Sequence, residues 1–269
     1  MSVQDERVEA FRKLHAEGCF VMPNPWDVGT AVALEEMGFK ALATTSAGHA
    51  WSVGRADNQL ELERALEHLR AVCSAVELPV NADFEGGFAV EPQQVAANVR
   101  LAVATGIAGI SIEDSTDDED EPLYGFELAV ERVRVARQAI DETGTGVLLT
   151  GRSEGFVVGR PDLEETIRRL KAFAEVGADC LYAPRLTTTE QVSAVVAAAS
   201  RKPVNLLVNE PFITVAEAAS LGVRRISVGG TLARTAWRGF LVAAQEIADH
   251  GTFSSFDGLP DVDAVFTKP

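Results

Sequence analysis

The sequence of 269 residues has few cysteines and no long apolar run. Its three cysteines, Cys19, Cys73 and Cys180, are odd in number, widely spaced and surrounded by apolar residues. This arrangement favours reduced thiols in the core over disulfides or a zinc site. No apolar stretch approaches the ~20 residues that cross a bilayer. Residues 1–15 form an amphipathic pattern and lack the apolar segment of a secretory signal, so we expect a cytoplasmic protein with no membrane partner.

Basic residues are scarce as well, with 24 Lys and Arg against 40 Asp and Glu and a net charge of −16. Such a field repels phosphates, and no basic cluster interrupts it, so nucleic acid is excluded as a partner. Nothing in the middle of the chain resembles a linker. We therefore expect one domain over residues 1–269. The turn-rich tail after Gly251 retains phenylalanines, which indicates docking on another surface, so we expect residues 231–269 to form a C-terminal helical segment that mediates dimerisation.

Short apolar runs alternate with amphipathic stretches from residue 18 onward. The stretches place apolar residues three and four apart, as on one face of a helix, and four of them end in a glycine suited to a left-handed helix end. Eight strand-helix units predict the α/β class and a (β/α)8 barrel of the TIM type. The glycines are Gly38, Gly106, Gly177 and Gly222, and the predicted strands are residues 19–22, 41–45, 79–83, 109–113, 146–150, 179–183, 203–208 and 225–229.

A doubly wound open sheet is the alternative to the barrel. Such a sheet usually carries a glycine-rich turn after its first strand, where the backbone binds a phosphate group. Here the first predicted strand runs into Met-Pro-Asn-Pro-Trp-Asp at residues 22–27, which contains no glycine. The sequence therefore favours the barrel.

Carboxylates directly follow several of the predicted strands. Asp83 ends the third, Glu113 ends the fourth with Asp114 directly after it, and Glu154 comes after the fifth. The carboxyl ends of the strands meet at one mouth of a barrel, where active sites are built. Carboxylates held together repel unless a cation or a proton separates them, which predicts a Mg²⁺ site with Asp83 and Glu113 as ligands. The alternatives are a capping role for Asp83 and a salt bridge between Glu113 and Arg152.

Two further features of the predicted barrel mouth suit an anionic ligand. Arg152 follows an apolar strand, where a guanidinium can clamp a carboxylate or phosphonate group. Backbone N–H groups in the turn of Ser46, Ala47 and Gly48 can hold a carboxylate or an oxyanion, although a plain hydroxyl-rich turn is an equal alternative. His49 has no Ser or Cys partner in the usual triad motifs and no Gly-x-Ser-x-Gly elbow is present, which argues against nucleophilic hydrolysis.

Three other segments remain open between a functional and a structural role. Trp26 lines a pocket or simply packs, and Asn205 and Asn209 face the pocket or satisfy backbone groups. Residues 115–125 hold five acids among turn formers after the fourth predicted strand. This composition predicts an exposed loop over the barrel mouth, and we expect it to act as a lid.

Taken in order, the segments PNPWD, TTSAGHA, GRAD, NADFEGG, GISIED, TGRSE and VGADCLYAP resemble the isocitrate lyase/phosphoenolpyruvate mutase superfamily. The resemblance runs from about Phe20 to the eighth predicted strand. It implies a barrel whose eighth helix is exchanged between subunits, in homodimers or homotetramers. It also implies Mg²⁺, a 2-oxo acid ligand, and bond making or breaking beside a carbonyl through an enolate intermediate.

The resemblance also assigns roles by position. It makes Asp83 and Glu113 residues of the metal shell, and Asp57 a residue that contacts the metal through water. The Ser46 turn would hold the substrate carboxylate and carbonyl, and Arg152 would pair with that carboxylate. The expected catalytic residues are Asp57, Glu113 and Arg152, the metal ligands are Asp83 and Glu113, and the substrate-binding residues are Trp26, Ser46, Ala47, Gly48, Asp83, Arg152 and Asn205.

One departure from the superfamily narrows the expected activity. Isocitrate and methylisocitrate lyases carry a Lys-(Lys/Arg)-Cys-Gly-His loop after the fourth strand, whereas residues 115–125 contain no Cys, Lys or His. We expect a Mg²⁺-dependent carbon-carbon lyase for a small 2-oxo or 2-hydroxy dicarboxylate, like oxaloacetate decarboxylase or dimethylmalate lyase, and not isocitrate lyase itself. The alternative is a protein of the same fold that binds pyruvate, oxaloacetate or 2-oxoglutarate without turnover.

Overall fold

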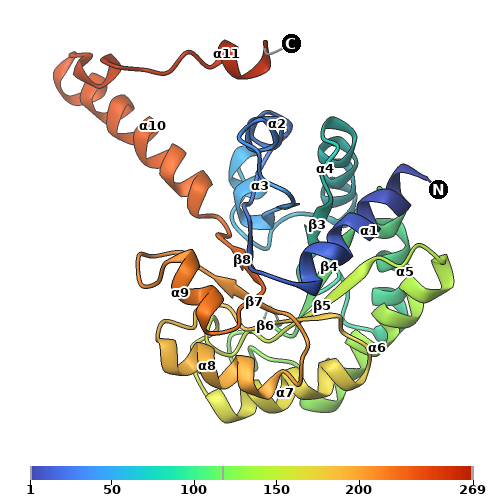
Figure 1. The fold of residues 1–269 in the computed structure, drawn as a ribbon. Coiled ribbons are helices and arrows are strands. Elements are labelled where there is room, and N and C mark those ends of the chain that lie inside the picture. Colours follow the sequence, from blue (N-terminus) through green and yellow to red (C-terminus); the bar gives the residue numbers. More distant parts are fainter. Residues whose placement is uncertain (1, 117, 268–269) are drawn as a thin grey trace.

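Parallel strands form a nearly closed, barrel-shaped sheet at the centre of the molecule (Figure 1). The computed structural model describes residues 2–116 and 118–267, and in them the strand order is β1-β8-β7-β6-β5-β4-β3-β2. This order confirms the predicted (β/α)8 barrel. The strands are β1 (Phe20–Met22), β2 (Leu42–Ala43), β3 (Val80–Asp83), β4 (Gly109–Glu113), β5 (Leu148–Arg152), β6 (Cys180–Tyr182), β7 (Val204–Leu207) and β8 (Arg225–Ser227).

Helices follow the strands around the outside of the barrel (Figure 1). The glycines predicted at helix ends all have the left-handed backbone, with φ between 87° at Gly38 and 108° at Gly177. None of the described helices is long and apolar enough to cross a membrane. The helices are α1 (Val3–Ala16), α2 (Val28–Glu36), α3 (Ser46–Ser52), α4 (Leu62–Ala75), α5 (Pro92–Val103), α6 (Phe126–Thr143), α7 (Leu163–Glu175), α8 (Thr189–Ala198), α9 (Val215–Ser220), α10 (Thr231–His250), the 3₁₀ turn η1 (Ser254–Phe256) and α11 (Asp263–Phe266).

The seam between β1 and β2 is closed by residues beyond the strand ends. The backbone N–H of Ala43 donates to the carbonyl of Pro23 at 3.1 Å. The side chain of Asn24 donates to the carbonyl of Thr44 at 3.0 Å and accepts from the N–H groups of Val228 and Gly229 at 2.9 Å. The Asn24 side chain therefore links the segments that follow β1, β2 and β8.

Two local elements differ from the prediction, and both bear on the candidate site. β5 extends to Arg152, so this residue belongs to the strand and does not follow it. The predicted Ser46 turn is the first turn of α3, because the Thr45 side chain caps the helix by accepting from the N–H of Gly48 at 3.2 Å. A threonine at this position favours helix initiation over a free turn.

The apolar core lies between the sheet and the helices, as expected for a parallel barrel. All three cysteines are free, as predicted. Cys73 and Cys180 are buried, whereas Cys19, just before β1, is half-buried, so the core prediction holds fully for only two of them. The barrel interior itself is unusually polar, with Asn81, Thr150 and Arg225 among its buried side chains.

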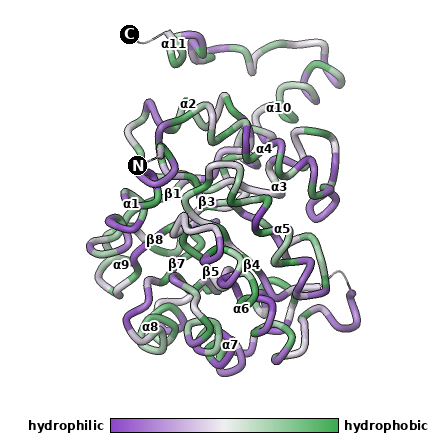
Figure 2. Tube along the Cα trace, turned by 90° about the vertical axis from the view of Figure 1, so that its right-hand side faces the viewer, coloured by the Kyte–Doolittle hydropathy of each residue, from purple (hydrophilic) through white to green (hydrophobic). Residues whose placement is uncertain are grey.

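The C-terminal segment from α10 to α11 stands away from the barrel (Figures 1 and 2). Of the residues in α10, only Ala233 is buried. α11 returns to contact α2. The large apolar side chains that this segment leaves exposed are Leu232, Trp237, Phe240, Leu241, Val242, Ile247, Phe253, Phe256, Leu259, Val262 and Phe266.

Two histidines are buried in the fold and held in the neutral state. The ring of His15, on α1, contacts the carbonyl of Phe11 through Nδ1 at 2.8 Å, and burial followed by the charge of Arg225 lowers its pKa to about 3. The ring of His68, on α4, stacks on His49 with centroids 3.8 Å apart. Burial, with a smaller effect of His49, lowers the pKa of His68 to about 3 as well.

These two histidines should make the fold sensitive to acid. Since their pKa values are lower in the folded state than the usual 6.5, the unfolded chain binds more protons and stability falls as the pH drops from 6.5 toward 3. At pH 5 each histidine should reduce the free energy of unfolding by about 2 kcal/mol. In urea unfolding at pH 7.5 and pH 5.0, His68→Leu should therefore lose less stability between the two values than the wild type.

The matched control is His250→Leu, because His250 lies exposed at the end of α10. This variant should show the same pH dependence as the wild type. An unchanged loss of stability in His68→Leu would contradict the assignment of His68 as a buried neutral group.

Candidate active site at the barrel mouth

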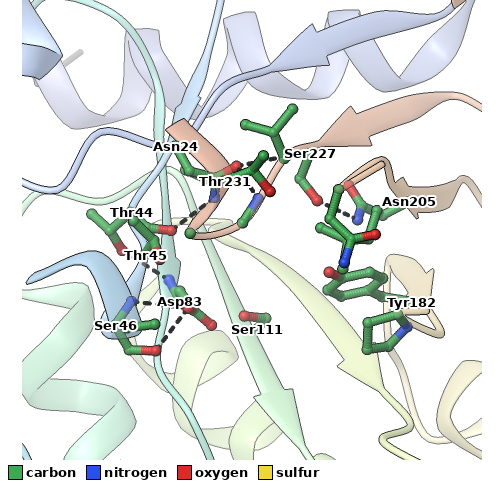
Figure 3. A pocket seen from close by; sticks show the side chains of 18 of the residues that line it. Asn24, Thr44, Thr45, Ser46, Asp83, Ser111, Tyr182, Asn205, Ser227 and Thr231 are labelled. Atoms are coloured by element: carbon green, nitrogen blue, oxygen red, sulfur yellow. Dashed lines mark hydrogen bonds between the residues drawn. The ribbon is translucent and has the colours of Figure 1, made fainter. Parts of the chain in front are cut away.

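A cavity of about 280 Å³ opens at the carboxyl ends of the strands. We call it the central cavity. Figure 3 shows Asn24, Thr44 and Asp83 on one side of it and Tyr182 and Asn205 on the other. The parallel barrel brings these residues together from segments far apart in the sequence.

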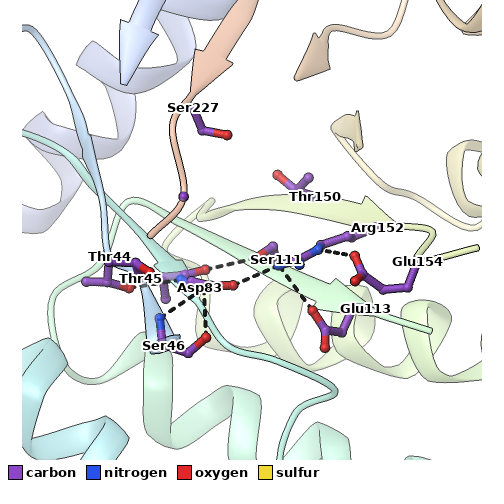
Figure 4. Close-up of polar contacts among 12 residues, drawn as sticks. Thr44, Thr45, Ser46, Asp83, Ser111, Glu113, Thr150, Arg152, Glu154 and Ser227 are labelled. Atoms are coloured by element: carbon purple, nitrogen blue, oxygen red, sulfur yellow. Dashed lines mark hydrogen bonds and ion pairs between the residues drawn. The ribbon is translucent and has the colours of Figure 1, made fainter. Parts of the chain in front are cut away.

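Asp83, at the end of β3, is the most heavily bonded carboxylate of the central cavity. One of its oxygens accepts from both the backbone N–H and the hydroxyl of Ser46, at 3.0 and 2.9 Å. The other accepts from Nη1 of Arg152 at 3.0 Å (Figure 4). The Asp83 carboxylate is thus fixed in one orientation at the wall of the cavity.

Arg152 pairs with three carboxylates (Figure 4). Nη1 lies 3.0 Å from Asp83 and 3.1 Å from Glu113, and Nε pairs with Glu154. Although burial alone would lower the pKa of Arg152, the charges of these three groups raise it. The salt bridge between Glu113 and Arg152, which the sequence left open as an alternative, is therefore present.

The carboxylates around Arg152 are not all neutralised by its single positive charge. Burial raises the pKa of Glu113, and the negative charge of Asp83 adds to this effect while Arg152 opposes it. Burial also raises the pKa of Glu154 to about 8, against the effect of Arg152. The cluster therefore favours an additional proton or cation.

The carboxylates do not form a preassembled metal cage in this structure. Among the described residues, no group of three or more His, Cys, Asp or Glu side chains is arranged to hold a metal ion. Mg²⁺, however, is usually bound through one or two carboxylates and completes its shell with water and substrate oxygens. Asp83 at the cavity wall, with Glu113 behind it, offers oxygen ligands of this kind, and the excess negative charge of the cluster fits a cation.

The other residues predicted for the site divide into two groups. Ser46, Ala47, Asp57 and Asn205 line the central cavity together with Asp83 and Arg152. Asp57 lies on the exposed loop between α3 and α4. Its pKa is raised first by partial burial and then by the charge of Asp83, so the two carboxylates interact.

Glu113, Trp26 and Gly48 do not line the central cavity. Glu113 lies behind Arg152 and faces a neighbouring groove with Tyr124. Trp26 instead packs on α3, where a Cβ atom at Gly48 would lie only 2.9 Å from its Cβ. Gly48 therefore allows close packing, and the indole that lines the cavity is that of Trp51.

Three arginines of the central cavity were missed in the sequence. Arg185 follows β6, Arg225 lies in β8 and Arg234 lies in the first turns of α10. Arg225 could have been noticed, since a charged residue inside a short apolar strand is uncommon. Arg185 has a left-handed backbone with φ of 61°, a strained conformation that the sequence does not reveal.

The acidic loop after β4 is a short hairpin in this structure. Ser115 pairs with Leu123, and the N–H of Tyr124 donates to the carbonyl of Asp114 at 2.9 Å. The side chain of Asp114 turns away from the cavity and pairs with Arg169 at 3.1 Å. None of the described residues of the loop lines the central cavity, so the lid remains a prediction; Asp117 lies outside the described residues.

The sequence matches proteins that share this barrel. The sequence profile of the phosphoenolpyruvate phosphomutase family matches residues 11–248. Rv1998c, an uncharacterized protein of Mycobacterium tuberculosis strain H37Rv, is 32% identical over 225 residues, which cover 82% of this chain and 81% of that protein. The crystal structure of a Burkholderia cenocepacia J2315 protein assigned as a lyase/mutase has a TM-score of 0.96 and 43% identity, with coverage of 100% of this chain and 99% of that one.

Two further relatives have assigned reactions. An oxaloacetate decarboxylase of Bradyrhizobium sp. ORS 278 is 27% identical over 194 residues, which cover 68% of this chain and 65% of that enzyme. The structure of a phosphonopyruvate hydrolase in complex with oxalate and Mg²⁺ has a TM-score of 0.85 and 25% identity, with coverage of 97% of this chain and 93% of that one. Because the family profile matches residues 11–248, which include all eight strands of the barrel, the chain belongs to the phosphoenolpyruvate mutase family of the isocitrate lyase/phosphoenolpyruvate mutase superfamily.

Proposed function

We propose that the protein is a Mg²⁺-dependent lyase for a small 2-oxo or 2-hydroxy dicarboxylate. The observation that carries the proposal is the cluster of Asp83, Glu113 and Glu154 around Arg152 at the wall of the central cavity. A plain structural salt bridge would need one carboxylate for one guanidinium. The additional carboxylates favour a bound cation, and the cavity beside them is of a size for a small ligand.

The donors that would hold a substrate carboxylate are already directed at a carboxylate. Ser46 and Arg152 both donate to Asp83 in this structure. A substrate carboxylate offers the same acceptor oxygens, so these donors would serve it when Asp83 binds Mg²⁺. Mg²⁺, when bound through Asp83 with Glu113 in its outer shell, would supply a Lewis acid for the carbonyl of the 2-oxo acid.

Two arginines at the central cavity support a substrate with a second carboxylate. Arg185 and Arg234 line the cavity, and neither makes an ion pair with a described residue. The Arg234 guanidinium lies 5.0 Å from the centroid of the Trp51 ring, which restricts its position. An anionic group at the far end of the ligand would therefore meet two positive charges, of which that of Arg234 also acts on Asp57.

Decarboxylation is the reaction that needs the fewest catalytic side chains beyond those already at the site. Loss of CO₂ leaves an enolate, which solvent can protonate without a dedicated acid. This suits a loop after β4 that carries no Cys, Lys or His at residues 115–125. The oxaloacetate decarboxylase among the relatives supports the same choice.

A 2-oxo acid binding protein without turnover is the second candidate. The acidic residues 118–121 would repel a second carboxylate during closure of the loop. Product formation separates the two candidates, because a binding protein would show affinity for the 2-oxo acid and release nothing.

We further propose that α10 packs on a second copy of the chain, through exchange of this helix in a homodimer or homotetramer. Its exposed apolar residues, among them Trp237, Phe240 and Leu241, support this assembly. An exposed apolar surface of this extent on one helix is typical of an interface.

The first test of the lyase proposal is turnover followed by NMR. With Mg²⁺, oxaloacetate should be converted to pyruvate and CO₂ faster than in buffer, and EDTA should abolish this difference. Asp83→Ala should lower kcat/KM by about 10³-fold, because it removes a metal ligand whose loss costs several kcal/mol of transition-state stabilisation.

The control variant is Glu175→Gln at the end of α7, which is exposed and lies outside the cavity lining. It should retain wild-type turnover. If neither oxaloacetate nor 2,3-dimethylmalate is consumed while 2-oxo acids still bind, the binding-protein candidate replaces the lyase.

The assembly is tested by sedimentation of a variant of α10. Phe240→Asp places a charge on the exposed apolar face, so it should convert a dimer or tetramer into a monomer without loss of secondary structure. The control substitution Ser193→Asp adds the same charge on the exposed face of α8, away from α10, and should leave the assembly intact. A monomeric wild type would contradict the helix exchange.

A further inference from the structure

Arg225 places a guanidinium inside the barrel, at the floor of the central cavity. The residue lies in β8, is 2% exposed and belongs to the cavity lining. The interior of a TIM barrel is usually filled by bulky branched apolar side chains. A buried arginine at this position therefore calls for an explanation.

The hydrogen-bond partners of Arg225 are all neutral. Nε donates to the side-chain oxygen of Asn205 at 2.8 Å, and Nη2 donates to the hydroxyl of Thr150 at 3.0 Å. Nη1 lies 3.4 Å from the side-chain oxygen of Asn81 and 3.4 Å from Nε2 of His15. These contacts engage Nε, Nη1 and Nη2 of the guanidinium without providing a negative charge.

No carboxylate within the described parts of the chain forms an ion pair with Arg225. His15, which closes the barrel below it, is neutral because its pKa is lowered to about 3. Arg152 differs in this respect, since three carboxylates surround it. A buried charge without a counter-ion is costly, so Arg225 retains a positive potential that is directed into the cavity.

We propose that Arg225 is a specificity-determining residue whose charge makes the central cavity prefer doubly charged over singly charged ligands. This inference rests on the proposed function and names the charge class of its ligand. Arg225 acts through its field, because its N–H groups are already bonded to Asn205, Thr150 and Asn81. In a cavity of low dielectric such a field is weakly screened, and its effect on the binding free energy is proportional to the charge of the ligand.

The proposal is tested by calorimetric titration of the full-length protein with oxalate, a dianion, and pyruvate, a monoanion, at pH 7.5 with Mg²⁺. Two variants remove the uncompensated charge in different ways. Arg225→Met deletes the guanidinium, and Asn81→Asp keeps it but provides a carboxylate next to Nη1. Arg224→Met is the matched control, because the Nη1 of Arg224 donates to the carbonyl of Gly18 on the outside of the barrel.

In both test variants we expect oxalate to bind about tenfold more weakly and pyruvate about threefold more weakly than in the wild type, since the change in free energy doubles with the ligand charge. Asn81→Asp should also unfold at a higher temperature than the wild type, because it pairs a buried charge. Arg224→Met should bind both ligands as the wild type does.

Equal weakening of oxalate and pyruvate in folded variants would indicate a structural role and overturn the inference, and so would unchanged binding of both. If Arg225→Met does not fold, Asn81→Asp alone decides between these outcomes. This variant keeps Arg225 and all of its contacts, and changes only the Asn81 amide to a carboxylate. A wild type that binds neither ligand with Mg²⁺ would instead refute the proposed function. The two failures are thus distinguishable.

Discussion

The ion-pair cluster around Arg152 is the interaction on which the candidate site depends. One guanidinium joins the ends of β3, β4 and β5 through Asp83, Glu113 and Glu154. Each of these carboxylates is buried or partly buried and would be unfavourable alone, so the cluster orients them as a group. The same arrangement keeps Asp83 at the cavity wall, bonded to Ser46 at the start of α3. The Arg152 side chain thus links β3, β4 and β5 and, through Asp83, the start of α3.

The fold could be predicted from the sequence because its signals are local and repeat. Each strand is a short apolar run, and glycines such as Gly38 and Gly177 end the preceding helices with a left-handed residue. The exact ends of the strands and helices were harder to predict from the sequence. β5 continues to Arg152 because the ladder with β4 pairs Glu113 with Arg152, and this pairing depends on a neighbouring strand. The helical start at Ser46 depends on the Thr45 cap.

A place at a strand end was the clearest signal for the site in the residues themselves, whereas Asp57 was indicated by the family resemblance. Asp83 and Arg152 lie at strand ends and line the cavity. Trp26 also lies shortly after a strand, yet its side chain packs on Gly48 and does not line the cavity. The direction of a side chain after a strand end depends on packing, which the sequence does not reveal. Arg185 and Arg234 reach the cavity from a strained loop and from α10. Their roles follow from the three-dimensional arrangement, which no spacing in the sequence encodes.

Arg152 and Arg225 are two buried positive charges of one barrel with different surroundings. Arg152 is neutralised by the protein and organises it, whereas the partners of Arg225 are all neutral. The two lie on β5 and β8, on different sides of one cavity. A ligand between them would enter a field that is already asymmetric before any metal is bound.

The seam between β1 and β2 gives the barrel a preferred place to open. Across it the sheet has no strand ladder in the described residues, and the Asn24 side chain supplies much of the polar connection. Because Asn24 also lines the central cavity, a ligand bound there would lie next to the side chain that links the two sides of the seam. One side chain is therefore shared by the wall of the cavity and by the seam of the barrel, which no strand ladder spans in the described residues.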